Sequence, residues 1–279
     1  MRWGASILLA AAFVSPAFAA NDVAVTQSGY DLRDPAEMVL AVDNNGTRFS
    51  WEFEYGRARQ RVIAFLEAGD AESALAAAKA QFILCPMDET SLEAAVLSVA
   101  EACEAAGEDE RAAVFEEFIR FGPEGADGEA GTADDLTDPL AGVAPHFPER
   151  GGAYYAEIDA TMDARAAIGE EWQARWYETE KVFARLDGGR FDEALSIVVP
   201  LLAESVKYPA ANVDGDWELQ RNQDIMDRID AALGIIYRAR TGTTAGVARF
   251  ISACKQYALY GPAGADDTMG TEDDLAPPI

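Results

Sequence analysis

The sequence predicts an all-α protein in which a helical-hairpin unit occurs twice in tandem, each copy ending in a loop rich in Asp and Gly. Three observations predict this fold. Apolar residues recur at i, i+3 and i+4, the spacing of helices that bury one face. Alanine-rich stretches such as residues 76–80 combine high helix propensity with side chains small enough for close helix packing. One loop pattern also occurs twice, 139 residues apart, as expected for an internal repeat.

Residues 1–19 are expected to be a secretory signal peptide. Arg2 precedes an apolar stretch from Ile7 to Val14, and the small-residue step Ala17-Phe18-Ala19 follows, with cleavage expected after Ala19. The apolar stretch is much shorter than the roughly 20 residues that cross a bilayer, and an uncleaved N-terminal anchor is the alternative. We therefore expect an exported protein, periplasmic or extracellular, without stable membrane insertion.

The chain is strongly acidic. Its 22 Lys and Arg residues stand against 49 Asp and Glu residues, a formal net charge of -27 in 279 residues. Such a charge repels nucleic acid and anionic lipid, so neither is expected as a partner. It suits a soluble exported protein, and it also suits a protein that holds divalent cations, because each bound ion relieves part of the self-repulsion. Solubility alone is the simpler explanation.

Residues 20–50 form an N-terminal extension outside the repeat. Within and just after it, apolar residues 38–42 and the segment Thr47–Phe53 flank Asn45-Gly46, a dipeptide typical of β-hairpin turns. A short hairpin is marginal by itself. Since Trp51 also falls in the first expected helix, a hairpin and a helix start both remain open for this segment.

Residues 51–139 form the first copy, for which four helices are expected. A first apolar stripe ends at the break Gly69-Asp70, and two further stripes follow. These stripes comprise Val62, Phe65 and Leu66, then Leu92, Val96 and Val99, then Val114, Phe115, Phe118 and Ile119.

Residues 140–163, with Pro145, His146, Pro148 and Gly151-Gly152, are interpreted as a linker. Residues 164–279 form the second copy, with four helices. Its segment Ala184–Leu195 matches Ala64–Leu75 at a shift of 120 residues, whereas the loops match at a shift of 139. The difference indicates an insertion in the second copy, which we place around residues 212–216. The helical stripe of the second copy continues with Ile225, Ile229, Leu233 and Ile236.

Three cysteines, Cys85, Cys103 and Cys254, follow the signal into an expected oxidising compartment. Cys85 ends one predicted helix and Cys103 lies about three turns into the next, too far apart to bridge easily. We therefore expect no structural disulfide. Cys103 and Cys254 continue apolar stripes, which predicts that both are buried as small apolar residues.

Several of these residues resemble the tetratricopeptide family of helical repeats. The segment Leu66–Asp70, then Ala74 and Leu75, then Pro86 is similar to the turn, small packing residue and closing proline of one repeat. A second set ends at Pro123, 37 residues after Pro86, near the family's period of about 34. The resemblance implies stacked helical hairpins, and a generic helical-hairpin array is the alternative. The remaining matching positions are Ala100–Gly107, Ala112 and Phe118, then Gly189, Phe191, Ala194, Pro209 and Pro262.

The two acidic loops are the candidate metal sites. Calcium prefers six to eight oxygen ligands, and glycines let a short loop fold its carbonyls inward. Three carboxylates close together are expected to repel one another unless a cation lies among them. We therefore predict about two calcium ions per chain, with a solvated acidic turn as the alternative. The candidate ligands are Asp127, Asp134 and Asp135 in the first loop, and Asp266, Asp273 and Asp274 in the second.

The pattern Gly-Ala-Asp followed by Asp-Asp-Leu also resembles the calcium loop of type II secretion pseudopilins over fewer than twenty residues of each copy. It departs from the EF-hand, which needs carboxylates at other positions. The shared glycines are Gly125 and Gly131 in the first loop and Gly264 and Gly270 in the second.

Nothing in the sequence indicates catalysis. His146 is the only histidine, and it lies in the expected linker rather than at a repeated position, so neither a His-based triad nor a multi-His zinc site is expected. No phosphate-binding loop, dinucleotide fingerprint or haem attachment motif is present. The leading hypothesis is a non-enzymatic protein that binds or scaffolds a protein or peptide, with calcium fixing each loop. A glycan-active enzyme that uses two helix-borne carboxylates, with structural calcium, is one alternative. A structural component of the envelope or cell surface is the other.

Overall fold

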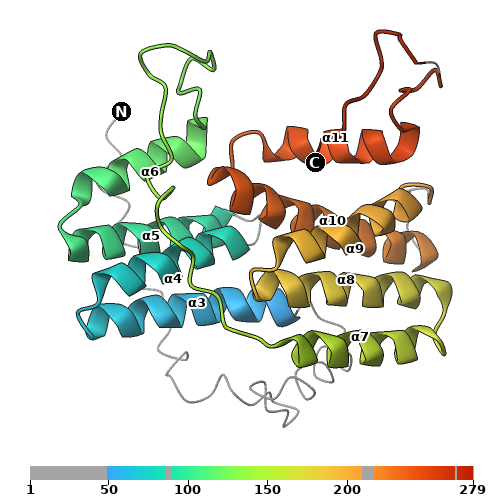
Figure 1. The fold of residues 1–279 in the computed structure, drawn as a ribbon, viewed down its shortest axis with the longest axis horizontal. Helices are drawn as coiled ribbons and strands as arrows, with labels where there is room; N and C mark the ends of the chain where they lie inside the picture. The colour runs from blue at the N-terminus through green and yellow to red at the C-terminus, as the bar shows by residue number, and fades with distance from the viewer. Residues whose placement is uncertain (1–48, 86–88, 209–216, 268, 279) are drawn as a thin grey trace. The chain divides into compact units, whose positions relative to one another are not determined.

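The computed structural model describes residues 49–85, 89–208, 217–267 and 269–278, and this part of the chain is all-α, as predicted (Figure 1). The expected signal peptide, the extension up to residue 48 and the expected insertion at 212–216 lie outside the described residues. The helices are α3 (Phe49–Glu67), α4 (Ala71–Leu84), α5 (Glu89–Ala106), α6 (Asp109–Phe121), α7 (Gly152–Ala166), α8 (Glu171–Asp187), α9 (Phe191–Ser205), α10 (Trp217–Thr241) and α11 (Val247–Tyr260).

Of the two alternatives left open for Thr47–Phe53, a hairpin and a helix start, the described part adopts the helix, because α3 begins at Phe49. A helix of 19 residues can pack against the other helices, which a lone hairpin cannot do. Ala58 and Val62 of α3 are fully buried, and the Tyr55 hydroxyl donates a 2.6 Å hydrogen bond to the Ser91 carbonyl of α5. These contacts favour the helix.

Helices α4, α5 and α6 pack in sequence order, α4 on α5 and α5 on α6. Ala74, Ala77 and Ala78 of α4 have no exposed surface. Small side chains on this face let the neighbouring backbones approach closely, as the alanine-rich stretch predicted.

Helix α8 lies at the centre of the helices from α7 to α10. It packs on α7, α9 and α10, and α10 in turn packs on α9, α11 and α4. Every residue from Thr179 to Asp187 of α8 is buried, which matches a helix covered on several sides.

Glycines end two of the helices, and a polar side chain caps the start of another. Gly122 and Gly261 end α6 and α11 with φ values of 78° and 69°, a region that favours glycine. Asp70 precedes α4, and its carboxylate accepts a 3.1 Å hydrogen bond from Ser73 N–H. This is an N-cap, which satisfies a donor that the helix leaves open.

One hydrophobic core runs through α4, α5, α8, α9 and α10. The predicted burial of two cysteines is confirmed, since Cys103 is 0% and Cys254 is 3% exposed. Arg238 of α10 crosses the core and is 2% exposed. Its guanidinium donates to the Ile83 carbonyl at 3.2 Å and to the Cys85 carbonyl, both at the end of α4.

The connection between α10 and α11 covers the end of α6. The Thr243 hydroxyl donates to the Phe118 carbonyl at 2.8 Å, and the Thr244 hydroxyl donates to the Ile119 carbonyl at 2.6 Å. An ideal Cβ added to Gly122 would lie 3.1 Å from Ala245 Cβ, so the two segments are in close contact.

The segment interpreted as a linker, 140–163, contains α7 from Gly152 onward. Its first part is anchored along its path. Lys79 Nζ donates to the Leu140 carbonyl at 2.5 Å, His146 N–H donates to the Ala76 carbonyl at 2.9 Å, and the Phe147 ring meets the Phe191 ring edge to face. Among the described helices, none combines the length and apolar character needed to cross a membrane.

Candidate functional site

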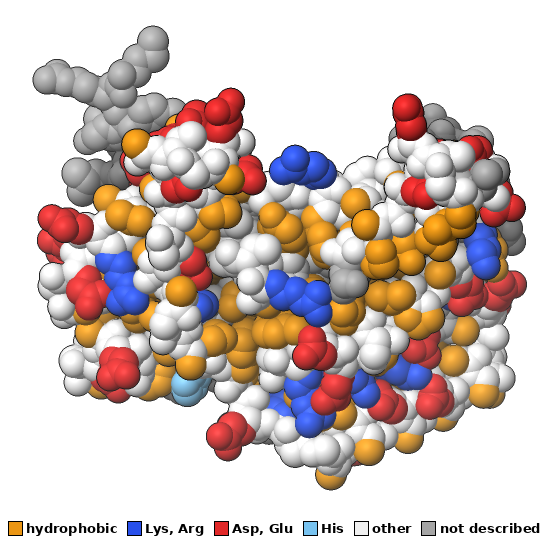
Figure 2. All heavy atoms as spheres, turned by 45° about the horizontal axis from the view of Figure 1, so that its top comes forward, with side chains coloured by type: hydrophobic (Ala, Val, Ile, Leu, Met, Phe, Trp, Pro, Cys, Tyr) orange, Lys and Arg blue, Asp and Glu red, His pale blue; other side chains and the backbone are white. Residues whose placement is uncertain are grey.

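Two places on the molecule carry groups suited to binding: the paired acidic loops, and a pocket between the start of α7 and the turn that joins α8 to α9. The loops follow α6 and α11 and extend in the same direction at the top of Figure 1. Figure 2 shows their acidic side chains as two separate groups, with apolar side chains and a few Lys or Arg side chains between them.

Each loop is closed at its base by a backbone hydrogen bond. Leu136 N–H donates to the Pro123 carbonyl, and Leu275 N–H donates to the Pro262 carbonyl, each over 2.9 Å. The closing residues occupy the same positions of the repeated pattern, so the two loops share their base geometry.

A buried glycine lets each loop fold tightly. Gly125 has φ 65°, and an ideal Cβ there would lie 2.2 Å from the Asp134 carbonyl oxygen. Gly264 has φ 67°, and its Cβ would lie 2.1 Å from the Asp273 carbonyl oxygen. Both the backbone conformation and the close approach therefore require glycine.

In the first loop, the half-buried Asp134 carboxylate accepts hydrogen bonds from the loop itself. Oδ2 accepts Ala126 N–H at 2.8 Å and Asp127 N–H at 3.1 Å, and Oδ1 accepts the Thr132 hydroxyl at 2.7 Å. Bonds to the ionised form favour that form. The Thr132 hydroxyl, followed by Asp127 N–H, accordingly lowers the pKa of Asp134 below its usual range.

The second loop repeats this arrangement at Asp273. Oδ2 accepts Asp266 N–H at 3.1 Å, and Oδ1 accepts the Thr271 hydroxyl at 2.7 Å. The pKa of Asp273 is lowered by the same causes, the Thr271 hydroxyl first.

The exposed Asp135 and Asp274 tie the other side of each loop. Asp135 Oδ2 accepts Gly131 N–H at 2.8 Å, and Asp274 Oδ2 accepts Gly270 N–H at 2.7 Å. Asp127 Oδ1 accepts Glu129 N–H at 2.9 Å. All three shared carboxylates of the first loop therefore face loop N–H or O–H donors.

These contacts bear directly on the calcium prediction. Carboxylates are ligands that calcium prefers, so the residue types fit. Their arrangement does not form a cage: within the described residues, no group of three or more Asp, Glu, His or Cys side chains is placed to hold a metal ion. Backbone N–H groups of the loops, which the loop pattern does not reveal, donate to these carboxylates and offset part of their mutual repulsion.

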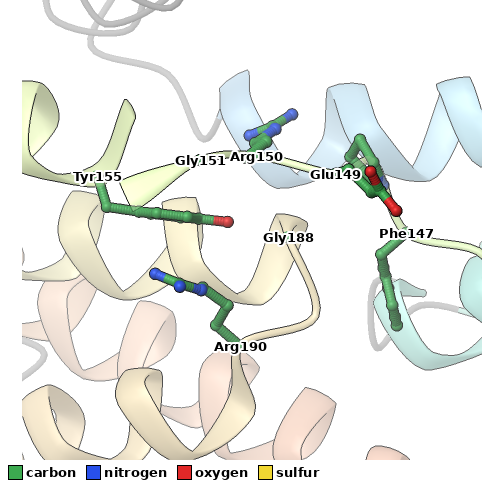
Figure 3. A pocket seen from close by; sticks show the side chains of 8 residues that line it. Phe147, Glu149, Arg150, Gly151, Tyr155, Gly188 and Arg190 are labelled. Carbon is green, nitrogen blue, oxygen red and sulfur yellow. The ribbon is translucent and has the colours of Figure 1, made fainter. Parts of the chain in front are cut away.

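The pocket has a volume of about 520 Å³ and is formed by the segment before α7, the first turns of α7, and the turn after α8 (Figure 3). Among the described residues that line it, Glu149 carries the one carboxylate. The lining residues are Phe147, Pro148, Glu149, Arg150, Gly151, Tyr155, Gly188 and Arg190.

Tyr155 lies at the centre of the pocket wall. It is 3% exposed, and its hydroxyl points toward Gly188 in Figure 3. An ideal Cβ added to Gly188 would lie 1.9 Å from the Tyr155 hydroxyl oxygen, so the ring occupies space that any larger residue would fill. Burial raises the pKa of Tyr155, against the opposing effect of Arg150 and Arg190.

Two arginines flank the Tyr155 hydroxyl. Arg150 stacks over the Tyr154 ring at 4.6 Å and donates to the Tyr154 hydroxyl at 2.5 Å. Arg190 stacks over the Tyr155 ring at 4.3 Å and donates to Glu193 at 3.1 Å. Stacking fixes the plane of each guanidinium.

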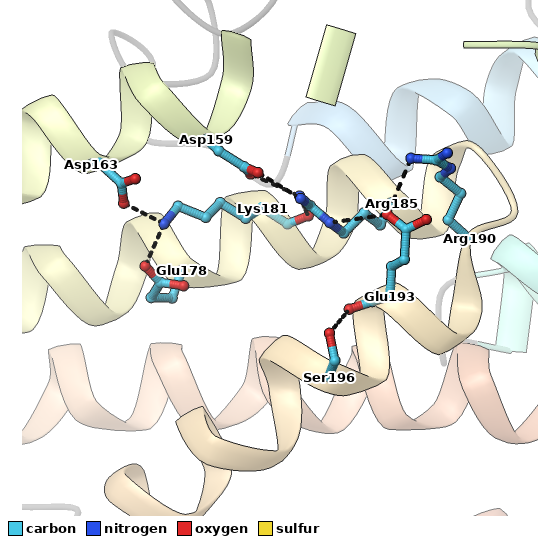
Figure 4. A network of polar contacts seen from close by, with 8 residues as sticks. All are labelled: Asp159, Asp163, Glu178, Lys181, Arg185, Arg190, Glu193 and Ser196. Carbon is cyan, nitrogen blue, oxygen red and sulfur yellow. Dashed lines mark hydrogen bonds and ion pairs between the residues drawn. The ribbon is translucent and has the colours of Figure 1, made fainter. Parts of the chain in front are cut away.

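A network of ion pairs holds α7 on α8 beside the pocket (Figure 4). Arg185 donates two hydrogen bonds to the Asp159 carboxylate, at 2.9 and 2.7 Å. Lys181 bridges Asp163 at 2.5 Å and Glu178 at 2.6 Å. The network keeps Tyr155, which α7 carries, in its position.

The sequence interpretation missed this pocket because it treated residues 140–163 as a linker. One signal was present. At the shift of 120 residues, Gly188 replaces Ala68 and Arg190 replaces Asp70. Both changes are explained by the packing of Tyr155. Gly188 leaves room for the Tyr155 hydroxyl, and Arg190, which takes the place of the N-cap residue, stacks on the Tyr155 ring.

No family model matches this chain, and comparisons with curated proteins and with solved structures likewise found no match.

Proposed function

We propose that this chain is a non-enzymatic helical-repeat protein that binds or scaffolds a protein or peptide at the face between its two acidic loops. The observation that carries the proposal is that two loops of the same hydrogen-bonded form extend in the same direction from the ends of α6 and α11. Between them lie apolar and basic side chains (Figure 2). An apolar surface with charged surroundings is typical of a protein-binding face.

The tandem repeat is part of this proposal. The sequence shift of 120 residues pairs the end of α3 and the start of α4 with the end of α8 and the start of α9. The loop shift pairs the segment after α6 with the segment after α11. Helices α3 to α6 and α8 to α11 thus correspond in order, with α7 as an addition, as expected for stacked tetratricopeptide-like hairpins.

The glycan-active alternative receives less support from the pocket. Glycoside hydrolysis uses two carboxylates about 5 to 9 Å apart. The described lining residues supply one, Glu149, and two arginines.

Capture of partners by the immobilised chain, residues 20–279, tests the binding function. The extract is prepared from the envelope and exported proteins of the source cells, and captured proteins are identified by mass spectrometry. We expect a partner that is lost with Gly125→Ala/Gly264→Ala, because each added Cβ collides with the loop backbone.

The matched control is Gly128→Ala/Gly270→Ala. These glycines also have positive φ, but an added Cβ meets nothing within 4 Å, so capture should persist. Equal capture by both double variants contradicts a role for the loops, and the absence of any specific partner contradicts the binding function.

Calcium in the loops is a second part of the proposal, and it rests on the three carboxylates that the sequence places in each loop. A ligand that binds only the folded state raises its stability. Calcium binding would therefore give about two ions per chain by calorimetry and a higher melting temperature than in chelator. Asp134→Asn/Asp135→Asn would remove one ion. A melting curve that chelator leaves unchanged contradicts calcium binding and leaves loops held by their own N–H donors.

A further inference from the structure

We propose that the pocket of Arg150, Tyr155 and Arg190 binds a carboxylate carried on an apolar skeleton. None of the loop carboxylates lines this pocket, so the proposal is independent of the partner-binding face. Its basis is a tyrosine hydroxyl that faces the pocket between two positioned guanidinium groups.

This hydroxyl is that of Tyr155. Tyr155 is 3% exposed, and within the part of the chain that the structure describes its hydroxyl makes no hydrogen bond. A phenolic hydroxyl that lines a pocket can donate to a group bound there. In Figure 3 the hydroxyl points into the space that Arg150, Gly188 and Arg190 surround. A bound acceptor would satisfy it.

The positive charges of Arg150 and Arg190 favour a negatively charged acceptor in the pocket. The Tyr154 and Tyr155 rings lie against the guanidinium faces of Arg150 and Arg190, and each guanidinium carries five N–H donors in one plane. Guanidinium edges match the planar geometry of a carboxylate. Arg150 and Arg190 come from different elements, and the ion pair of Arg190 with Glu193 further restricts its position.

A single negative charge fits better than two. Glu149 lines the pocket, Glu193 pairs with Arg190, and the buried Asp187 acts electrostatically on Tyr155. These carboxylates offset part of the positive charge, so a dianion such as phosphate meets more repulsion than a carboxylate does. Phe147 and Pro148 supply an apolar wall for the rest of the ligand.

The two halves of the chain differ at this turn in a way that favours a binding role. Asp70 caps α4 through Ser73 N–H, whereas Arg190 precedes α9 without a side-chain cap. Replacing a capping residue usually lowers stability. The second turn therefore lacks a stabilising contact that the first turn has, and in its place it presents a cation to the pocket.

Binding is tested on the chain of residues 20–279 by calorimetry and saturation-transfer NMR, with 3-phenylpropionate as the probe. The uncharged 3-phenylpropanol and inorganic phosphate are compared with it. N-acetylphenylalanine and its amide distinguish a peptide C-terminus from a free small carboxylate as the source of the group. We expect saturable binding of 3-phenylpropionate at one site, and weaker binding of the alcohol and of phosphate. Tighter binding of N-acetylphenylalanine than of 3-phenylpropionate, lost in its amide, would identify the peptide source. Equal or weaker binding would identify the free carboxylate.

Arg190→Asp is the most informative variant. It should weaken binding of the probe at least tenfold, because a cation becomes an anion. It should not lower the melting temperature, since Asp restores the capping residue that the first turn has. Arg150→Gln should likewise weaken binding, and Tyr155→Phe should weaken it about tenfold or more, because the hydrogen bond that is lost has a charged acceptor.

Arg240→Gln is the matched control. Arg240 is exposed and pairs with Asp192 on α9, outside the pocket, so its replacement should leave binding unchanged. The proposal is overturned if 3-phenylpropionate does not saturate one site, if the alcohol or phosphate binds as tightly, or if Arg190→Asp retains full affinity.

Discussion

At the scale of single residues, the acidic loops show that the type of a side chain does not by itself reveal its contacts. Asp134 has the residue type of a calcium ligand, yet its oxygens accept two backbone N–H groups and one hydroxyl. The sequence shows that the glycines and aspartates of the two loops recur together. It could not reveal the partners of the carboxylates, since these depend on which way the loop backbone turns its N–H groups.

The Asp134 contacts predict the pH dependence of the loop. The pKa of Asp134 is lowered in the folded chain, so the hydrogen bonds are present above the usual Asp pKa and are lost as the pH falls through the lowered value. The Ala126 and Asp127 amide resonances should therefore shift with a midpoint below 3.8, the ordinary value.

The measurement is an NMR pH titration of the loop amides. Asp134→Ala should abolish the shift at both amides, whereas Glu129→Gln, a change of an exposed carboxyl in the same loop, should retain it. Titration of these amides at the ordinary Asp value would contradict the hydrogen-bonded loop.

At the scale of elements, hydrophobic periodicity predicted the helices well. The stripe Leu92, Val96 and Val99 lies in α5, and the break at Gly69-Asp70 separates α3 from α4. Helix α7 was missed because Pro148 and Gly151-Gly152 indicate a linker. The helix is stabilised by the contacts of Tyr155, Ile158 and Met162 with other elements, and such contacts override local signals.

A buried ion pair links α8 to α10. Arg228 is 1% exposed, stacks on Trp176 at 4.3 Å, and pairs with Glu180, which is 5% exposed. Its Nε donates to the Thr179 hydroxyl at 2.6 Å. Glu180→Gln should lower the free energy of unfolding by about 3–5 kcal/mol, because it leaves a buried charge without its counter-charge.

Urea unfolding followed by circular dichroism measures this effect. The double variant Glu180→Leu/Arg228→Met should recover much of the loss, because it removes both charges. If the single variant unfolds at the same urea concentration as the unchanged chain, the pair does not contribute as described.

At the scale of the molecule, buried polar contacts join the half that contains α3 to α6 to the half that contains α8 to α11. No sequence pattern predicts these contacts. Arg238 reaches from α10 to carbonyls at the end of α4, 153 and 155 residues away in the chain. Burial lowers the pKa of Arg238 to about 10, which still leaves it charged at neutral pH. Helical periodicity predicts which face is buried, but it does not predict which distant helix covers that face.

Arg238→Met should lower the free energy of unfolding by about 2–3 kcal/mol, because two carbonyls lose a charged donor. Arg240→Met, at an exposed position two residues further along α10, should change it by less than about 0.5 kcal/mol. Chemical denaturation of both variants makes the comparison, and equal effects would rule out the core contact as a joint between the halves.

The bonds from Thr243 and Thr244 to the last carbonyls of α6 also affect how the chain can be divided. A fragment that stops after residue 139 contains α6 but lacks the atoms that complete its final turn. If the two halves are produced as separate fragments, we therefore expect the last turn of α6 to fray and to expose unpaired carbonyl groups. The two halves are best kept on one polypeptide.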